Sequence, residues 1–88
     1  MARVRAFEIG GVYMWFPSGD HEPPHFHARR SDEWDARVYV LAPAGSMIEL
    51  VRPPGATIKG ADRKAIIEGV EVNRAALLLE WEQSQGLS

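Results

Sequence analysis

The sequence predicts an α+β fold, in which a small antiparallel sheet of about four or five strands precedes a C-terminal helix. Residues 1–55 are mainly short, strand-like runs separated by turns rich in proline and glycine. Residues 60–84 instead space their apolar side chains as one face of a helix does. Because the strands all precede the helix, the strand–helix alternation of a parallel sheet is missing. With 88 residues, the chain is predicted to form a single domain, 1–88.

The first two strands are predicted around a glycine pair. Residues 5–9 and 12–16 are rich in strand-forming side chains, and Gly10 and Gly11 lie between them. A glycine pair between two apolar runs is typical of a tight turn or a bulge. We therefore expect a short hairpin here, followed by a turn at 17–20.

Three further strands are predicted after that turn. The prolines at 23–24 exclude a helix, so the next strand is expected over 25–29. Residues 34–41 alternate between an apolar and a polar face, as a half-buried strand does. Residues 47–51 are expected to form the last strand, which the prolines at 53–54 end.

The C-terminal helix is predicted from six apolar residues at helical spacing, which are Ile66, Ile67, Val70, Leu77, Leu78 and Trp81. Thr57 or Asp62 is expected to cap its start. Glycine costs about 1 kcal/mol relative to alanine inside a helix. We therefore expect the helix to bend at Gly69, or to split into two near 69–73. Three consecutive leucines, Leu77–Leu79, cannot all lie on the one apolar face of a helix, so one of them should be exposed or covered by a partner.

The composition excludes several classes of protein. Hydrophobic residues make up 45% and charged residues 25%, which argues against intrinsic disorder. The absence of cysteine excludes disulfides, thiolate zinc sites and cysteine nucleophiles. A net charge of −2 argues against a generally basic, nucleic-acid-binding surface, although residues 1–30 carry four arginines against three carboxylates. Neither a signal peptide nor a membrane span is evident, so a cytoplasmic protein is expected.

Three histidines lie within seven residues and are the only histidines in the chain. If 25–29 is a strand, His25 and His27 point to one face and Phe26 points to the core. His21 lies on the preceding turn, which can fold back toward them. Three imidazoles suit a divalent transition metal such as zinc. They equally suit metal-free acid–base chemistry or phosphate binding near neutral pH. The residues leave open which of these applies, and whether the histidines form a functional site at all.

Arg29 is expected on the same face as His25 and His27, where it could bind a phosphate or a carboxylate. Asp35 and Arg37 on the neighbouring strand should share that surface. Such a surface is compatible with RNA cleavage by acid–base catalysis, as in small ribonuclease toxins. The three tryptophans are expected in the core, and they are Trp15, Trp34 and Trp81.

Residues 20–28, Asp-His-Glu-Pro-Pro-His-Phe-His-Ala, resemble the signature of a family of small, mostly bacterial proteins that constitute a domain of unknown function. The resemblance covers nearly the whole chain. An aromatic-rich strand at 13–16 precedes the signature, and a helix ending in Leu-Leu-Leu-Glu-Trp at 77–81 follows it. The chain departs from the family at 42–60, where two proline-containing turns lengthen a loop that the family keeps short.

The resemblance implies that His21, His25 and His27 carry the function of the family. It also implies a small partner protein, because its members are often encoded beside one, as in a toxin–antitoxin pair. Two alternatives remain. One is a small metal-binding protein, with Asp20 or Glu22 as additional ligands. The other is a non-enzymatic interaction module, a homo-oligomer or hetero-complex that uses the leucine-rich helix. Whether the protein is an enzyme stays open.

Overall fold

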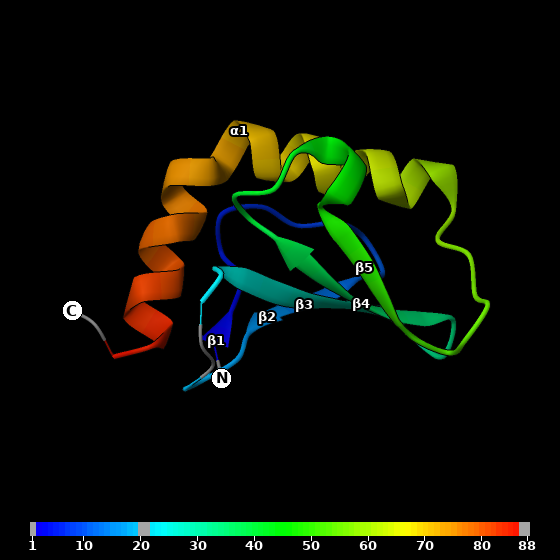
Figure 1. The fold of residues 1–88 in the computed structure, drawn as a ribbon, viewed down its shortest axis with the longest axis horizontal. Helices are drawn as coiled ribbons and strands as arrows, with labels where there is room; N and C mark the ends of the chain where they lie inside the picture. The colour runs from blue at the N-terminus through cyan, green and yellow to red at the C-terminus, as the bar shows by residue number, and fades with distance from the viewer. Residues whose placement is uncertain (1, 20–21, 87–88) are drawn as a thin grey trace.

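The computed structural model describes residues 2–19 and 22–86. It confirms the predicted α+β fold, because a five-stranded antiparallel sheet precedes a single helix that covers one face of the sheet (Figure 1). The strands lie side by side in chain order, and they are β1 (Ala2–Arg3), β2 (Tyr13–Phe16), β3 (His25–Arg30), β4 (Trp34–Tyr39) and β5 (Ile48–Arg52). A short 3-10 turn, Ala44–Ser46, precedes β5, and the helix α1 spans Gly60–Ser84.

Alternation along the strands separates a buried face from an open face. In β3, Phe26 and Ala28 are fully buried beneath α1, whereas His27 and Arg29 point to the other side. In β4, Trp34, Ala36 and Val38 continue the buried face, as the sequence predicted. The helix contributes its own fully or nearly fully buried residues to this core, which are Ile66, Val70, Leu77 and Trp81.

The helix bends within the predicted interval. Asn73 has non-helical angles (φ −113°, ψ 19°), and its side-chain amide donates a hydrogen bond of 2.8 Å to the carbonyl of Gly69. A side chain that inserts into the backbone ladder in this way is a common cause of a kink. The second half of α1 therefore turns down along one end of the sheet (Figure 1). No helix in the described part of the chain is long and apolar enough to cross a membrane.

The start of the helix is held by the sheet rather than by a side-chain cap. The helix follows Lys59, and no side chain caps it, so the prediction that Thr57 or Asp62 does so is wrong. The carboxylate of Asp62 instead accepts two hydrogen bonds of 2.8 Å from Arg30 at the end of β3. The same guanidinium donates to the carbonyl of Gly10 at 2.9 Å. Arg30 thus connects the sheet, the first glycine turn and the helix.

The predicted strand at 5–9 is wrong, because this segment leaves the sheet and crosses to the helix. The backbone amide of Arg5 donates to Glu80 of α1 at 2.7 Å. The ring of Phe7 packs edge-on against Phe26 at 6.1 Å. The strand that pairs with β2 is instead the shorter β1. The glycine turn is present, and a single bridge joins Ile9 and Val12 across it.

Two predictions about large apolar side chains have different outcomes. Trp34 and Trp81 are 2% exposed and lie in the core, as expected. Trp15 does not, because it lies between buried Met14 and Phe16 and alternation turns it to the open face. The leucine run does leave one member exposed, which is Leu79 at 56%.

Gly69 provides a test of the packing between α1 and the 5–9 segment, since a Cβ at this position would overlap the ring of Phe7. We expect Gly69→Ala to lower the free energy of unfolding, measured by urea denaturation. Overpacking costs about 1–3 kcal/mol, whereas the better helix propensity of alanine contributes only about 1 kcal/mol. In a Phe7→Ala background the same substitution should instead stabilise the protein. If Gly69→Ala lowered the free energy of unfolding equally in both backgrounds, the close approach of Phe7 to Gly69 would be contradicted.

Candidate functional site

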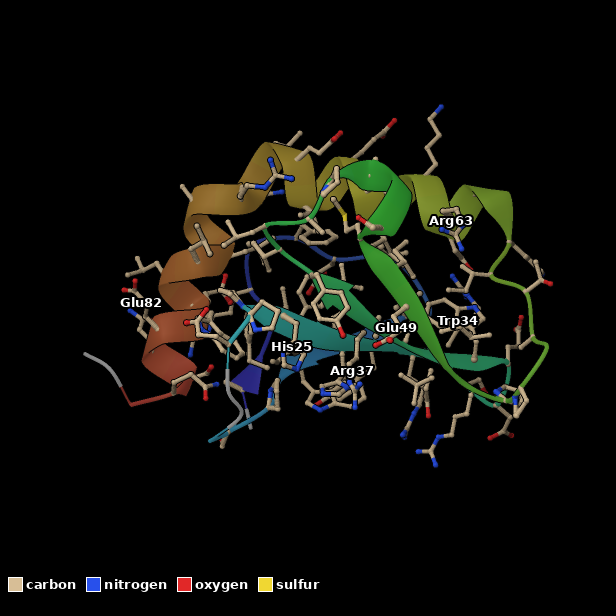
Figure 2. The ribbon with its side chains drawn as sticks, in the orientation of Figure 1. His25, Trp34, Arg37, Glu49, Arg63 and Glu82 are labelled. Carbon is tan, nitrogen blue, oxygen red and sulfur yellow. The ribbon has the colours of Figure 1, made fainter. Side chains whose placement is uncertain are left out.

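The open face of the sheet carries two rows of polar and aromatic side chains. The first row crosses four strands in register, from Trp15 through His27 and Arg37 to Glu49. The second row lies one pleat further on and consists of Tyr13, Arg29, Asp35 and Arg52. Arg37 extends from the sheet on the side away from α1 (Figure 2). We call these eight residues, together with His25, the open-face site.

Three aromatic rings of this site form a continuous stack. The rings of Tyr13 and Trp15 are parallel within 24°, with centroids 5.1 Å apart. The rings of Trp15 and His27 are parallel within 17° at 5.2 Å. Tyr13 is 44% exposed, and the guanidinium of Arg29 lies 5.5 Å from the Trp15 ring in a cation–π contact. His27 is therefore held by an aromatic neighbour at the centre of a partly solvated surface.

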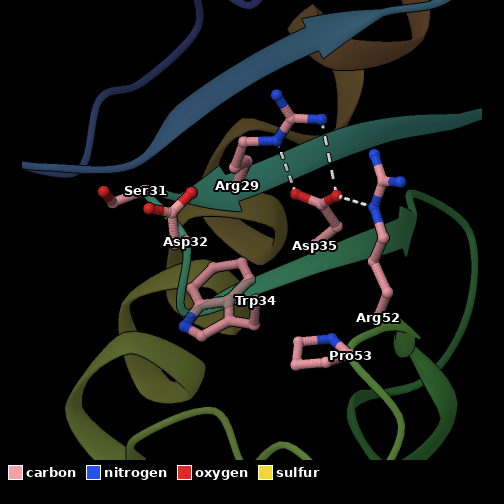
Figure 3. Close-up of a pocket in the computed structure, with 7 residues that line it drawn as sticks. All are labelled: Arg29, Ser31, Asp32, Trp34, Asp35, Arg52 and Pro53. Atoms are coloured by element: carbon pink, nitrogen blue, oxygen red, sulfur yellow. Dashed lines mark hydrogen bonds and ion pairs between the residues drawn. The ribbon is translucent and has the colours of Figure 1, made fainter.

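One carboxylate gathers two arginines at the second row. Arg29 donates to Asp35 at 2.6 and 3.4 Å, and Arg52 donates to the same carboxylate from the other side (Figure 3). The hydrogen bond from Arg29 is the main cause that lowers the pKa of Asp35, and Arg52 lowers it further while burial opposes them. The three side chains line a hollow of about 360 Å³. Asp35 thus stays ionised and orients both guanidinium groups.

A second carboxylate organises the neighbouring row. Glu49 accepts a hydrogen bond of 2.8 Å from the hydroxyl of Tyr39 and one of 3.4 Å from Arg37. The hydrogen bond to Glu49, followed by burial, raises the pKa of Tyr39. Across the open-face site, three arginines accompany two carboxylates, so its formal charge is positive although the chain is negative overall.

His25 lies at the edge of the open-face site and is only 6% exposed. Its Nδ1 is 2.9 Å from the carbonyl of Pro23. A carbonyl oxygen only accepts, so this nitrogen carries the proton of that hydrogen bond. The ring packs against Trp81 of α1 with centroids 5.3 Å apart, and it makes a T-shaped contact with the ring of His27 at 5.5 Å. His25 is labelled in Figure 2. His25 is therefore positioned by the helix and supports His27 from one side.

The structure brings three of the four predicted site residues together. His25, His27 and Arg29 share one face, as alternation predicted. His21 lies outside the described residues, so a cluster of three imidazoles is not tested. Within residues 2–19 and 22–86, no group of three histidine, cysteine, aspartate or glutamate side chains is arranged to hold a metal.

Sequence reasoning missed four contributors to the site, which are Tyr13, Trp15, Glu49 and Arg52. Trp15 was expected in the core, although its position between Met14 and Phe16 in a strand of alternating burial was a usable signal. Arg52 follows the predicted end of the last strand by one residue, and only the pairing of β5 with β4 brings it to Asp35. No local sequence pattern indicates that pairing.

The lowered pKa of Asp35 predicts a pH dependence of stability. Its pKa is lower in the folded than in the unfolded chain, so its contribution is present above the unfolded pKa of about 3.9 and is lost as the pH falls below it. We expect Asp35→Asn to lower the free energy of unfolding at pH 7 and to flatten its decline below about pH 4. Urea denaturation across this range measures both effects. Glu82→Gln, at an exposed helix position, is the control. If the free energy of unfolding declined as steeply below pH 4 in Asp35→Asn as in the unmodified protein, the lowered pKa of Asp35 would be contradicted.

Of the comparisons with known proteins, the one with protein-family models gave a match. Residues 11–82 match the model of the Domain of unknown function (DUF4160), and these residues include every strand from β2 to β5 and nearly all of α1. No curated protein matches the chain. No solved structure matches it either. Because the matched segment covers most of the sequence, the chain belongs to the DUF4160 family.

Proposed function

We propose that the open-face site cleaves RNA with His27 as its acid–base group, and that the protein is the toxin-like member of a bacterial toxin–antitoxin-like pair. The observation that carries this proposal is the position of His27. It lies between the Trp15 ring and its register partner Arg37, with Arg29 two residues further along the same face. An imidazole can exchange protons near neutral pH and guanidinium groups bind phosphate oxygens, so together they can support phosphodiester cleavage without a metal.

The chemistry follows from these roles. His27 accepts the proton of a ribose 2′-hydroxyl, whose oxygen attacks the adjacent phosphorus and forms a new P–O bond. The bond between phosphorus and the 5′-oxygen breaks, and water supplies a proton to that oxygen. The hydroxide that remains takes up the proton from His27, which restores the starting state. The products are a 2′,3′-cyclic phosphate and a 5′-hydroxyl. Arg29 and Arg37 stabilise the charge that develops on the phosphorane, since guanidinium groups bind such oxygens in a fork geometry.

His25 serves as a positioning residue in this proposal. It is almost fully buried, and its hydrogen bond to Pro23 fixes the orientation of its ring. Its ring meets the edge of His27, so it restricts the conformations of the His27 imidazole. His25 therefore acts through His27 rather than on the substrate.

Metal binding by His21, His25 and His27 remains the alternative prediction. It depends on His21, whose position is not described, and the described residues alone supply no group of three such ligands. The metal-free reaction instead depends on contacts that are present, namely the stacking of His27 on Trp15 and the nearby guanidinium groups. These contacts favour acid–base chemistry as the first hypothesis.

The catalytic proposal predicts that His27→Ala lowers the rate of RNA cleavage by about 10²- to 10⁴-fold, the usual contribution of a general acid–base group. End-labelled single-stranded RNA resolved by electrophoresis measures the rate and identifies the cyclic phosphate. Cleavage should survive treatment with a chelator, whereas its loss would support the metal alternative. Val72→Ala, on the outer surface of α1, is the control. Equal cleavage by His27→Ala and the unmodified protein would refute the proposal.

The positioning role of His25 has its own test. Asparagine places an amide donor near the position of Nδ1, so His25→Asn should retain more activity than His25→Ala. Both variants should keep the pH profile of the unmodified protein, because the acid–base group assigned to the reaction, His27, is unchanged in both. A change of the profile in His25→Asn would instead place His25 among the groups that exchange protons with the substrate.

The outer surface of α1 is the surface that we infer to bind the partner. Val72 is 83% exposed and Leu79 is 56% exposed, and two exposed alanines lie between them at helical spacing. Exposed acidic residues flank this stripe, and they are Glu68, Glu71 and Glu82. Two copies of the chain would bring like charges together, so a partner with an apolar helix and a basic rim fits better.

This inference predicts that Leu79→Asp abolishes the complex while leaving the fold intact. Leu78 is the less informative position, because it packs partly against the core. The chain is co-expressed with the proteins encoded by its neighbouring genes, and complexes are isolated by size-exclusion chromatography. Leu41→Asp, at a residue that is 57% exposed and does not belong to α1, is the control and should leave the complex unchanged. A complex that survives Leu79→Asp would place the partner elsewhere.

A further inference from the structure

A second, smaller hollow lies within the open-face site. Its volume is about 260 Å³, and its lining includes Trp15, His27, Arg29, Val51 and Arg52. Its lining residues come from four neighbouring strands, β2 to β5. Ligand pockets that enclose a drug-sized molecule have about 300–1,000 Å³. This hollow is smaller, and it suits a single planar ring system.

The walls of the hollow suit a nucleobase. Trp15 and His27 line one side of the hollow, and their rings are stacked on each other with centroids 5.2 Å apart. Val51 provides an apolar surface that is 45% exposed, at the point where the register between β4 and β5 shifts. A flat, aromatic molecule gains stacking energy from such walls, and this gain depends little on which base is bound.

The rim of the hollow suits a phosphate. Arg29 and Arg52 line this hollow and also the neighbouring hollow of about 360 Å³. Asp35 binds one edge of each guanidinium, and the side chains are 44% and 66% exposed. Each arginine has five N–H donors, so donors remain for a phosphate beside the base. The two hollows thus place an aromatic subsite next to a cationic one.

We propose that this hollow binds one unpaired nucleobase packed against the Trp15 and His27 rings that line it, with the adjoining phosphates on Arg29 and Arg52, so that the substrate of the open-face site is single-stranded RNA. This inference rests on the proposed function and names the substrate class of the same site. A duplex is excluded because its bases are already stacked inside the helix and present no free face.

Binding is tested separately from cleavage by using a ligand that cannot react. The probe is a fluorescein-labelled hexanucleotide with 2′-O-methyl groups, which removes the attacking hydroxyl. Fluorescence anisotropy gives its Kd for the unmodified protein and for each variant. Trp15→Ala should raise Kd by about 5- to 150-fold, which corresponds to about 1–3 kcal/mol for one stacked base. Trp15→Phe keeps an aromatic ring and should bind within about tenfold of the unmodified protein.

The phosphate contacts have a different signature. Arg29→Gln and Arg52→Gln should each reduce the dependence of log Kd on log salt concentration by about 0.7, the value for one contact with a single strand. Arg63→Gln, at an exposed position of α1 outside the open face, removes the same charge and is the matched control. A hexanucleotide with abasic sites lacks the base that the hollow binds. Its Kd for the unmodified protein should therefore be as high as the Kd of the intact hexanucleotide for Trp15→Ala. A duplex of the same sequence should bind more weakly than the single strand.

The outcomes distinguish this inference from the proposed function. The proposed base-binding hollow would be overturned if the abasic, duplex and single-stranded probes bound with equal Kd. It would also be overturned if folded Trp15→Ala and Trp15→Phe bound the single strand as tightly as the unmodified protein. Cleavage of unmodified RNA that still requires His27 would then leave the proposed function standing. Conversely, base-dependent binding without any cleavage of unmodified RNA would support the pocket and refute catalysis. Circular dichroism of each variant confirms that it is folded.

Discussion

Alternation along β3 is the constraint on which both the core and the site depend. Phe26 and Ala28 are fully buried, so the helix must cover their side of the sheet. The same geometry places His27 and Arg29 on the opposite side, at the centre of the sheet. A shift of the register by one residue would exchange the two sets and bury charge in the core. The packing of the hydrophobic face therefore also fixes the orientation of the candidate catalytic face.

The helix lies on the buried face of the sheet but still positions residues at both ends of β3. Its first turn is bound to β3 through Arg30 and Asp62, at the end of the strand. Its bend at Asn73 turns the second half along the other end of the sheet, where Trp81 contacts His25. Both ends of β3 are thus held by one element. This arrangement connects the stability of the core with the position of the histidine pair.

The charges of the open face are arranged in pairs that favour ligand binding. Asp35 orients Arg29 and Arg52, and Glu49 orients Arg37, so the guanidinium groups are already placed before a ligand arrives. Preorganised charges lose less conformational entropy on binding than mobile ones. The net charge of the whole chain is negative, but what a phosphate encounters is this local surface.

The sequence by itself determined the order of the elements and the faces of the central strands. Periods of two and 3.6 residues are local properties, so the α+β fold and the shared face of His25, His27 and Arg29 could be predicted from it. The bend of the helix near 69–73 could be predicted from another local property, the low helix propensity of Gly69. The tertiary structure alone decided which distant segments meet. The segment at 5–9 leaves the sheet because Glu80 binds its backbone and Phe7 fills the space that Gly69 leaves beside the helix. The pairing of Arg52 with Asp35 and of Arg30 with Asp62 arises in the same way, because contacts between residues far apart in the chain depend on packing that no local pattern specifies.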